Sequence, residues 1–517
     1  MPDFIDIALL PSEAEDPVAI AQKLRAAGKS AEQRHVISKR SIDARKKPVL
    51  IRMRFAIYNI DETPPLFEFE PVAKNVAGAP EVFIAGSGPC GLFAALQLIE
   101  NGFKPIILER GKDVRARRRD LAKLNKEHIV NPDSNYCFGE GGAGTYSDGK
   151  LYTRSKKRGS VNRILNTLVY FGAPREILVD AHPHIGTNKL PQIITEIRNF
   201  IESCGGEIRF ETRLTDIDVA GGKVQKIQAN GSEWITCKNL ILATGHSARD
   251  IFYLLDRRGI LIEAKPFALG VRVEHPQEII DRIQYNCDVR SPYLPPASYN
   301  VVQQVNNRGV YSFCMCPGGI IAPCATAPGE VVTNGWSPSK RNNPFANSGL
   351  VVSIDESLFD PQAKGNPLAA LEYQQIVERK AWELGGKTQS APGQRLVDFV
   401  QKKLSTNLPK CSYQPGIESA ELRDCLPHDV SSRLQEALKA FGKKMKGYYT
   451  NEAVLVATES RTSSPVRIPR NREFSHVEIA GLYPAGEGAG YAGGIVSAAI
   501  DGQKVADAIA TLAETAS

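Results

Sequence analysis

The 517-residue sequence contains no apolar run long enough to cross a membrane. A membrane-spanning helix needs about 20 predominantly apolar residues in succession. The N-terminal stretch MPDFIDIALLPSEAED carries acidic residues where a secretory signal peptide has a basic segment and an apolar core. The sequence therefore predicts a cytoplasmic protein without a membrane anchor.

Signatures of several other classes of protein are also missing. We find no H-E-x-x-H motif, no Walker loop, no zinc-type spacing of Cys and His, and no repeats. The ten cysteines are scattered through apolar segments, which does not suggest a disulfide framework in a chain of this length. We expect a reducing compartment and no metal site.

The length of the chain predicts two to four domains, at roughly 100–200 residues each. Strand-like patterns over 4–10 and 47–60, with a helix beginning at Asp16 and ending at Gly28, indicate a small αβ unit, and 61–80 has the Pro and Gly content of a linker. The expected domains are a small N-terminal αβ domain (1–75), a nucleotide-binding domain (76–250), a substrate or cap domain (251–452), and a C-terminal return to the nucleotide-binding domain (453–517).

The net charge of +7 is concentrated in two basic segments. Arg34–Arg54 carries eight Lys or Arg against one Asp, and Lys104–Lys126 contains the run RARRR at Arg115–Arg119. Each segment is either a solvated helix face or a surface that docks an anion, such as a phosphate, a nucleic acid or an acidic electron-donor protein. Both interpretations remain open at this stage.

A dinucleotide fingerprint begins after the apolar run at 81–86. Gly86, Gly88 and Gly91 form G-x-G-x-x-G between a strand and a helix, and Glu109 ends the next strand. Such glycines allow a tight turn, a close approach of the backbone to a pyrophosphate and close helix–strand packing, while the acid binds ribose hydroxyls. The residues expected to hold the nucleotide here are Gly86, Ser87, Gly88, Pro89, Cys90, Gly91, Glu109 and Arg110.

This fingerprint serves both FAD and NAD, but the later pattern distinguishes them. A helix over 189–206 is followed by alternating segments with turn signals at 221–222 and 230–231, which predict a β-meander that returns to the sheet at 240–245. NAD dehydrogenases normally continue with further βα units. Here the sheet is closed only near the C-terminus, which favours FAD.

Two later motifs resemble those of the glutathione-reductase-like FAD superfamily: LILATG at 240–245 and GLYPAGEGAG at 481–490. The resemblance implies an α/β fold, namely a Rossmann-type FAD domain with a β-meander, an inserted mixed α+β substrate domain and the small N-terminal αβ domain. It also implies that a helix beginning near Ile495 points its N-terminus at the flavin. The acid of the late motif is Glu487, where many relatives have Asp. The residues implied to bind FAD are Ala243, Thr244, Gly245, Gly486, Glu487, Gly493, Gly494 and Ile495.

Over nearly its whole length the chain resembles a bacterial family of uncharacterised FAD-dependent dehydrogenases. The resemblance is carried by six segments: SIDARKKPV, FGEGGAGTYSDGKLYTR, FCMCPGG, TNGWS, ESRTSSPVRIPR and GEGAGYAGGIVSAAIDG. It implies that the glycine-rich loop over 140–151 lies against the isoalloxazine, through Gly142, Gly144 and Thr145. The alternative for this loop is a plain surface loop.

Four side chains are candidates for chemistry at the flavin. Cys314 and Cys316 could form a redox pair, or with Cys324 contribute to a cluster, or simply pack in an apolar strand. Arg461 could face an anionic substrate or the flavin, or cap the sheet through an Arg–Glu pair. His246 follows the ATG motif and could transfer a proton or merely pack.

The source of electrons stays open, because 246–480 holds no second dinucleotide fingerprint. NAD(P)H can bind transiently, the substrate can reduce the flavin, or an acidic protein can donate. The leading hypothesis is an FAD-dependent oxidoreductase that transfers hydride or electrons to or from a small substrate between the FAD and middle domains. The alternative is a flavin-containing binding or RNA-modifying factor with a basic N-terminal contact, although that unit lacks interleaved aromatics for stacking bases, so nucleic acid is the less favoured partner.

Overall fold

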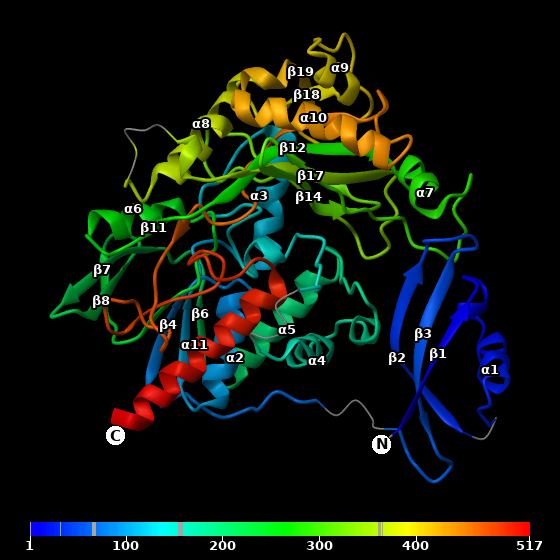
Figure 1. Cartoon of the computed structure of the whole chain (residues 1–517). Helices are drawn as coiled ribbons and strands as arrows, with labels where there is room; N and C mark the ends of the chain where they lie inside the picture. Colours follow the sequence, from blue (N-terminus) through cyan, green and yellow to red (C-terminus); the bar gives the residue numbers. More distant parts are fainter. Residues whose placement is uncertain are drawn as a thin grey trace.

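The structure is a computed structural model that describes residues 2–30, 33–64, 69–153, 159–359, 363 and 365–516. Figure 1 shows a parallel sheet with its helices in the lower part of the molecule, a second large sheet above it, and a small N-terminal unit at the side. The predicted α/β class is confirmed. The narrower assignment to the glutathione-reductase-like fold stays a prediction.

The parallel sheet has five strands in the order β22-β10-β4-β5-β6. Their bounds are β4 (Glu81–Ala85), β5 (Lys104–Leu108), β6 (Glu207–Arg209), β10 (Leu240–Leu242) and β22 (Leu482–Pro484). Leu240 of β10 lies opposite Phe83 of β4 and Leu482 of β22, so the segments that carry the early, middle and late motifs are adjacent strands. All three motifs therefore leave the sheet at the same, carboxyl edge.

Both faces of the parallel sheet are covered. On one face, Ile84, Ile107 and Ile241 pack with four helices: α2 (Pro89–Glu100), α4 (Val161–Tyr170), α5 (Leu190–Ser203) and α11 (Ile495–Ala516). On the other face, Phe83 and Leu242 pack with α6 (Arg249–Arg257) and the expected meander, which consists of β7 (Leu214–Ala220), β8 (Lys223–Ala229) and β9 (Glu233–Thr236). Residues of one strand alternate between two cores, as in parallel sheets buried on both sides.

The second large sheet has seven strands in the order β13-β14-β17-β12-β20-β18-β19. Their bounds are β12 (Phe267–Pro276), β13 (Val302–Val305), β14 (Arg308–Cys316), β17 (Phe345–Ile354), β18 (Ala391–Arg395), β19 (Ile417–Ser419) and β20 (Val454–Glu459). Figure 1 shows helices above it and at its end: α7 (Gln277–Tyr285), α8 (Ala369–Leu384), α9 (Leu396–Gln401) and α10 (His428–Lys444). Two short pairs complete this region, β15 (Ile320–Pro323) with β16 (Thr333–Trp336), and β11 (Glu263–Ala264) with β21 (Val466–Arg467).

The expected boundary at residue 453 does not coincide with the return to the parallel sheet. Strand β20 pairs with β12 and β18 inside the seven-stranded sheet, and the chain rejoins the parallel sheet only at β22. Sequence patterns could not assign β20 and β22 to different sheets, because the buried strands of both sheets are short apolar runs.

The N-terminal unit is a three-stranded antiparallel sheet, β1-β3-β2, with one helix. Its elements are β1 (Asp3–Leu9), α1 (Pro17–Ala26), β2 (Arg34–Asp43) and β3 (Leu50–Tyr58). The interpretation of Arg34–Arg54 as a helix face is wrong, because this segment forms the β2–β3 hairpin. Of the linker expected over 61–80, residues 65–68 lie outside the described residues.

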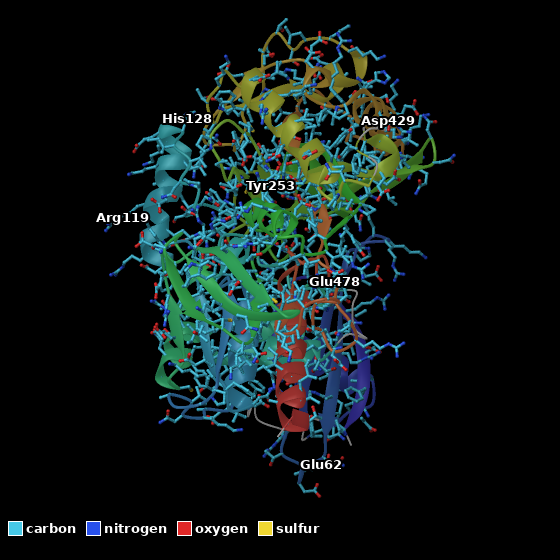
Figure 2. All side chains as sticks on the ribbon, turned by 90° about the vertical axis from the view of Figure 1, so that its left-hand side faces the viewer. Glu62, Arg119, His128, Tyr253, Asp429 and Glu478 are labelled. Carbon is cyan, nitrogen blue, oxygen red and sulfur yellow. The ribbon has the colours of Figure 1, made fainter. Side chains whose placement is uncertain are left out.

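The second basic run lies on helix α3 (Val114–Glu127), which Figure 2 shows at the edge of the molecule with Arg119 projecting outward. Arg117 is fully buried, whereas Arg115, Arg118 and Arg119 are exposed. The Arg117 guanidinium donates to the carbonyl oxygens of Asn135 (2.7 Å) and Glu140 (2.9 Å). A docking surface on this helix can therefore use three of the four arginines.

Candidate functional site

The turn after β4 explains why its glycines are needed. Gly86 has φ +105°, and a Cβ there would lie 2.5 Å from the carbonyl oxygen of Ala243. A Cβ on Gly91 would lie 2.0 Å from the carbonyl oxygen of Gly86. Gly88 differs from these two glycines, since the atom nearest to a Cβ built on it would be the Cα of Gly142, at 3.9 Å. Two glycines thus allow close packing of the turn, while Gly88 leaves open space beside the start of α2.

Glu109 ties three backbone segments together. Its carboxylate accepts hydrogen bonds from Ser87 N (3.0 Å) and Oγ (2.6 Å), from Gly111 N (2.8 Å) and from Gly139 N (3.0 Å). The side chain is 4% exposed. The structure therefore shows Glu109 fixing the dinucleotide turn and the glycine-rich loop, and its predicted contact with a ribose stays a prediction.

The glycine-rich loop lies against the dinucleotide turn. The loop contains the short helix η2 (Gly142–Gly144). A Cβ built on Gly142 would lie 3.1 Å from Gly88 Cα, and a Cβ built on Gly144 would lie 3.2 Å from Pro89 and 3.6 Å from Ile495. The plain surface loop is thus the wrong alternative, because this loop lies between the starts of α2 and α11. Thr145 is brought there too, but its buried hydroxyl donates to the carbonyl oxygen of Glu140 (2.6 Å).

The ATG and GEG motifs close the opposite side. A Cβ on Gly486 would lie 3.0 Å from Cys90 Cβ, and one on Gly488 would lie 2.7 Å from the carbonyl oxygen of Gly245. The backbone amide of Ala243 donates to the carbonyl oxygen of Ala85 (2.9 Å), which joins the ATG segment to β4. The early, middle and late motifs therefore meet at one place, as the sequence predicted.

Glu487 links the segment after the ATG motif to the segment before α11. One carboxylate oxygen accepts a hydrogen bond from the backbone amide of Gly494, and the other lies 3.7 Å from Nε2 of His246. Burial lowers the pKa of His246, against the opposing effect of Glu487. The His246 ring is therefore neutral at neutral pH, and it is oriented by Glu487 on one side and by Ser247 Oγ (3.0 Å from Nδ1) on the other.

The late motif is fixed from behind by a pair of residues that sequence reasoning missed. Asp501 accepts a hydrogen bond from Gly486 N (2.8 Å) and pairs with Arg470 at 2.6 Å. The Arg470 guanidinium also lies 3.8 Å from the ring centroid of Tyr491. No sequence signal marks this pair, because the two charges are 31 residues apart on a loop and a helix.

The converging glycines leave open space beside the backbone, and we call this open space the channel. No heavy atom lies within 4 Å of a Cβ built on Gly245, Gly493 or Gly494, and helix α2 begins at Gly88 without a side-chain cap. Helix N-termini offer unpaired N–H groups and the positive end of the dipole, which favour phosphate and other anions. The residues therefore fit a dinucleotide whose negatively charged groups approach the starts of α2 and α11.

A hollow of about 250 Å³ lies beside Arg110 and Gly111, just after Glu109 in the chain. Arg110 forms ion pairs with Asp133 (2.8 Å) and Asp250 (2.9 Å), and its guanidinium lies 4.2 Å from the ring centroid of Phe138. The sequence predicted Arg110 but missed the remaining lining residues, which come from separate loops: Gly111, Lys112, Asn131, Asp133, Ser134, Glu211, Arg213 and Asn230.

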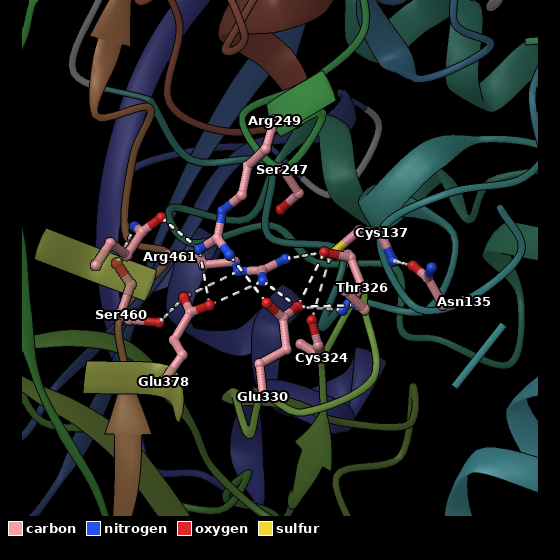
Figure 3. A network of polar contacts seen from close by, with 12 residues as sticks. Asn135, Cys137, Ser247, Arg249, Cys324, Thr326, Glu330, Glu378, Ser460 and Arg461 are labelled. Carbon is pink, nitrogen blue, oxygen red and sulfur yellow. Dashed lines mark hydrogen bonds and ion pairs between the residues drawn. The ribbon is translucent and has the colours of Figure 1, made fainter. Parts of the chain in front are cut away.

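Arg461 lies in a buried network of charges rather than at an open surface (Figure 3). Its guanidinium pairs with Glu330 (2.6 Å) and Glu378 (3.0 Å), and the side chain is 5% exposed. Arg249 pairs with the same two carboxylates, at 2.9 and 2.7 Å. Of the alternatives for Arg461, the geometry favours the structural Arg–Glu pair, with partners that come from the β16 region and α8.

Cys314 and Cys316 lie at the end of β14, beside Lys150. The ammonium of Lys150 is 3.7 Å from both sulfur atoms and donates to the carbonyl oxygen of Met315. Cys324 lies elsewhere, with its carbonyl oxygen 3.8 Å from the Cys137 sulfur. Among the residues that the structure describes, no group of three or more His, Cys, Asp or Glu side chains could hold a metal ion.

Family models match two parts of this chain. Residues 266–462 match the family described as "FAD-dependent protein, C-terminal domain-like", and residues 1–58 match a domain of unknown function. An uncharacterized protein of Clostridium beijerinckii is 42% identical over 495 residues, which cover 92% of this chain and 91% of that protein. The first match indicates FAD as the cofactor.

Solved structures give a weaker likeness. A geranylgeranyl bacteriochlorophyll reductase-like protein from Thermoplasma acidophilum has a TM-score of 0.36 at 12% identity, covering 85% of this chain and 80% of its own. Glycine oxidase from Bacillus cereus has a TM-score of 0.30 at 13% identity, covering 85% and 96%. Scores this low carry no argument about fold or chemistry. In the described part of the chain, no helix has the length and apolar character of a membrane span.

Proposed function

We propose that this chain, which belongs to the same family as the Clostridium beijerinckii protein, is an FAD-dependent oxidoreductase that transfers hydride or electrons between bound FAD and a small substrate. The observation that supports the proposal is the open space beside the glycines at the start of α2, after the ATG motif and before α11. Three motifs separated by hundreds of residues converge there, and Gly88, Gly245, Gly493 and Gly494 keep it free of side chains. When bound, FAD supplies a two-electron donor and acceptor.

The residues of the chain have separable tasks in this proposal. The start of α2, with Gly88 and Gly142, accommodates the pyrophosphate. The start of α11, reached through Gly493 and Gly494, stabilises negative charge on the flavin ring. His246, neutral and oriented by Glu487, is placed to hold a proton on a ring nitrogen next to the ATG and GEG segments. The substrate binds between these segments and the seven-stranded sheet.

Two variants test the channel directly. A Cβ on Gly88 meets nothing closer than 3.9 Å in the protein, and the residue has φ −70°, so Gly88→Ala leaves the fold intact. The added methyl group would occupy the approach of a pyrophosphate. Gly78→Ala is the matched control, since Gly78 is exposed and no atom lies within 4 Å of its built Cβ.

We expect the purified protein to show a flavin absorbance spectrum, and released FAD to be identified by chromatography. Gly88→Ala should retain the thermal unfolding midpoint but lose FAD, while Gly78→Ala keeps both. Anaerobic reduction followed by absorbance, with NADH, NADPH and a panel of metabolites, identifies the donor. The proposal is wrong if the protein binds no flavin, or if Gly88→Ala binds it as well as the unchanged protein does.

The identities of the donor and partners are further proposals. NAD(P)H as a transient reductant and an acidic donor protein that docks on α3 are both compatible with Arg115, Arg118 and Arg119 in solvent. The RNA-modifying alternative depends on the basic β2–β3 hairpin. Gel-shift assays at low and physiological salt test it, and no binding at either salt removes it.

A further inference from the structure

The end of strand β14 has a distorted backbone that brings two thiols to one ammonium group. Pairing between β14 and β17 shifts register between Phe313 and Cys316, and Cys314 has φ +46°, in the left-handed region that non-glycine residues rarely adopt. Such bulges re-aim side chains, and strained residues of this kind cluster at functional sites. Here the result is that the Cys314 and Cys316 sulfurs are both 3.7 Å from Lys150 Nζ.

A second cation supports the first. The Arg272 guanidinium is 3.6 Å from the Cys316 sulfur and donates to the carbonyl oxygen of Cys314 (2.6 Å). Arg272 is itself fully buried and pairs with Glu459 at 2.9 Å. Lys150 is held similarly, since Asp148, whose side chain is 2% exposed, lies 3.7 Å from its ammonium. Both cations are thus fixed before any ligand arrives.

The two thiols differ in chemistry. A hydrogen bond from Cys316, followed by the charges of Lys150 and Arg272, holds the pKa of Cys314 well below its usual value despite burial. The hydrogen bond to Cys314, together with burial, raises the pKa of Cys316. By contrast, burial raises the pKa of Cys237 and of Cys425 to about 12. Cys314 is therefore the more acidic thiol of the two.

The two thiols also differ in access. Cys314 is half-buried, whereas Cys316 is fully buried. Lys150, with 36% of its side chain exposed, belongs to the same glycine-rich loop (140–151) as η2, which contacts the starts of α2 and α11. The pair therefore lies where the channel wall meets the seven-stranded sheet, the region in which the substrate is proposed to bind.

We propose that Cys314 and Cys316 form a redox-active dithiol that reduces a disulfide substrate, with Cys314 as the attacking thiolate and Cys316 as the resolving thiol. This inference rests on the proposed function, because the electrons that restore the dithiol come from the reduced flavin. An accessible thiolate backed by a buried thiol is the arrangement that thiol–disulfide exchange requires.

The Cys314 thiolate attacks one sulfur of R–S–S–R′, forming a mixed disulfide and releasing R′–S⁻. Cys316 then loses its proton to solvent and attacks the Cys314 sulfur, which releases R–S⁻ and leaves a Cys314–Cys316 disulfide. Two electrons and one proton from the reduced flavin regenerate one thiolate and one thiol. Lys150 and Arg272 stay protonated throughout and compensate the thiolate charge.

The first experiment treats the native protein with the aromatic disulfide dithiobis(nitrobenzoate), whose thiolate product is coloured. The remaining free thiols are then alkylated under native conditions, and each cysteine peptide is identified by mass spectrometry. We expect the unchanged protein to release two coloured thiolates at this site and to gain an internal Cys314–Cys316 disulfide. Cys316→Ser should release one and retain a mixed disulfide on Cys314, and Cys314→Ser should release none here. Freely alkylated Cys314 and Cys316 after this treatment overturn the inference.

The role of Lys150 has its own readout. We expect alkylation of Cys314 by iodoacetamide to show a midpoint well below pH 8.5, the value of an ordinary thiol, and Lys150→Met to raise that midpoint while Lys150→Arg largely preserves it. Cys287, a half-buried thiol in the same sample, serves as the internal control. Equal midpoints for Cys314 and Cys287 contradict the inference.

Exchange with the flavin is tested by anaerobic titration with dithionite. The oxidised protein should take up twice as many reducing equivalents per FAD as Cys314→Ser, and oxidised glutathione or the disulfides of insulin distinguish a small from a protein substrate. Equal uptake overturns the flavin-linked role. A protein that binds no flavin but releases both coloured thiolates refutes the proposed function alone, so the two failures are distinguishable.

Discussion

The Glu109 carboxylate lies 2.6 Å from the Ser87 hydroxyl, and it also accepts a hydrogen bond from the Ser87 backbone amide. The same side chain holds the amides of Gly111 and Gly139. The turn that begins α2 and the loop that faces it are therefore positioned by one buried charge. Glu109 therefore has a structural role at the start of α2 whether or not it touches a ribose.

Glu109→Gln should weaken FAD binding by about 10–100-fold, because the amide group of Gln faces N–H donors and loses charge-assisted bonds of about 1.5–3 kcal/mol each. Fluorescence titration of the apoprotein with FAD measures the change. Glu81→Gln is the control, since Glu81 belongs to the same sheet but is exposed and pairs with Lys104 at 3.1 Å. An unchanged affinity in Glu109→Gln would show that the tether does not shape the channel.

Arg117→Met should destabilise the protein by about 2–4 kcal/mol, because two carbonyl oxygens lose their buried donor. Arg119→Met, on the same helix but exposed, should change stability by less than about 0.5 kcal/mol. Chemical denaturation followed by circular dichroism compares the two variants. Similar losses in both would contradict the burial of Arg117.

The buried pair Arg272–Glu459 predicts an asymmetric response to mutation. Arg272→Met leaves a buried carboxyl without its cation, and should cost about 3–5 kcal/mol, whereas the double variant Arg272→Met/Glu459→Gln should recover part of this loss. Burial raises the pKa of Glu459 to about 7 even with Arg272 present. Thermal unfolding of the single and double variants measures the coupling, and additive losses would exclude it.

We expect His275 to lower the free energy of unfolding of the protein in mild acid. Burial lowers its pKa from 6.5 to about 4, and Nε2 donates to the carbonyl oxygen of Tyr448 at 2.8 Å. The unfolded chain therefore takes up this proton first, so the stabilising contribution is complete above pH 6.5 and is lost as pH falls towards 4. The full difference is about 3 kcal/mol.

His275→Gln retains a donor for Tyr448 without a titrating ring. We expect its free energy of unfolding to fall less steeply than that of the unchanged protein between pH 6.5 and 4. Urea denaturation at several pH values gives both curves. Parallel curves would mean that His275 does not contribute to the acid response.

Much of the site could be predicted because its motifs are local. The glycines after β4, the ATG segment and the GEG segment each follow a short apolar strand, and parallel strands bring such ends to one edge. The Arg461 network could not be predicted, since Arg461 is 131 residues from Glu330 and 83 from Glu378. Pairing over such distances is decided by packing between α6, α8 and β20 rather than by any local pattern.

The secondary structure of the basic N-terminal hairpin was difficult to predict for a different reason. Strand β2 has alternating side chains, but most of them are exposed or half-buried, and Lys and Arg obscure the period. Charge composition alone therefore did not exclude a solvated helix face, although the pattern over 47–60 predicted a strand. The burial of Arg117 could not be predicted either, because nothing in RARRR distinguishes the one arginine that faces the protein interior from its neighbours.

The packing of α11 on α2 determines when this protein can acquire its cofactor. Gly502 of α11 is so close to α2 that a Cβ would lie 2.1 Å from the carbonyl oxygen of Cys90, and both β22 and α11 belong to the last part of the chain. Roughly 400 residues separate the two helices, which a ribosome adds in about 20–80 s at 5–20 residues per second. During that interval the apolar face of α2 is uncovered, so a cofactor that contacts both helices can bind only after α11 has been synthesised.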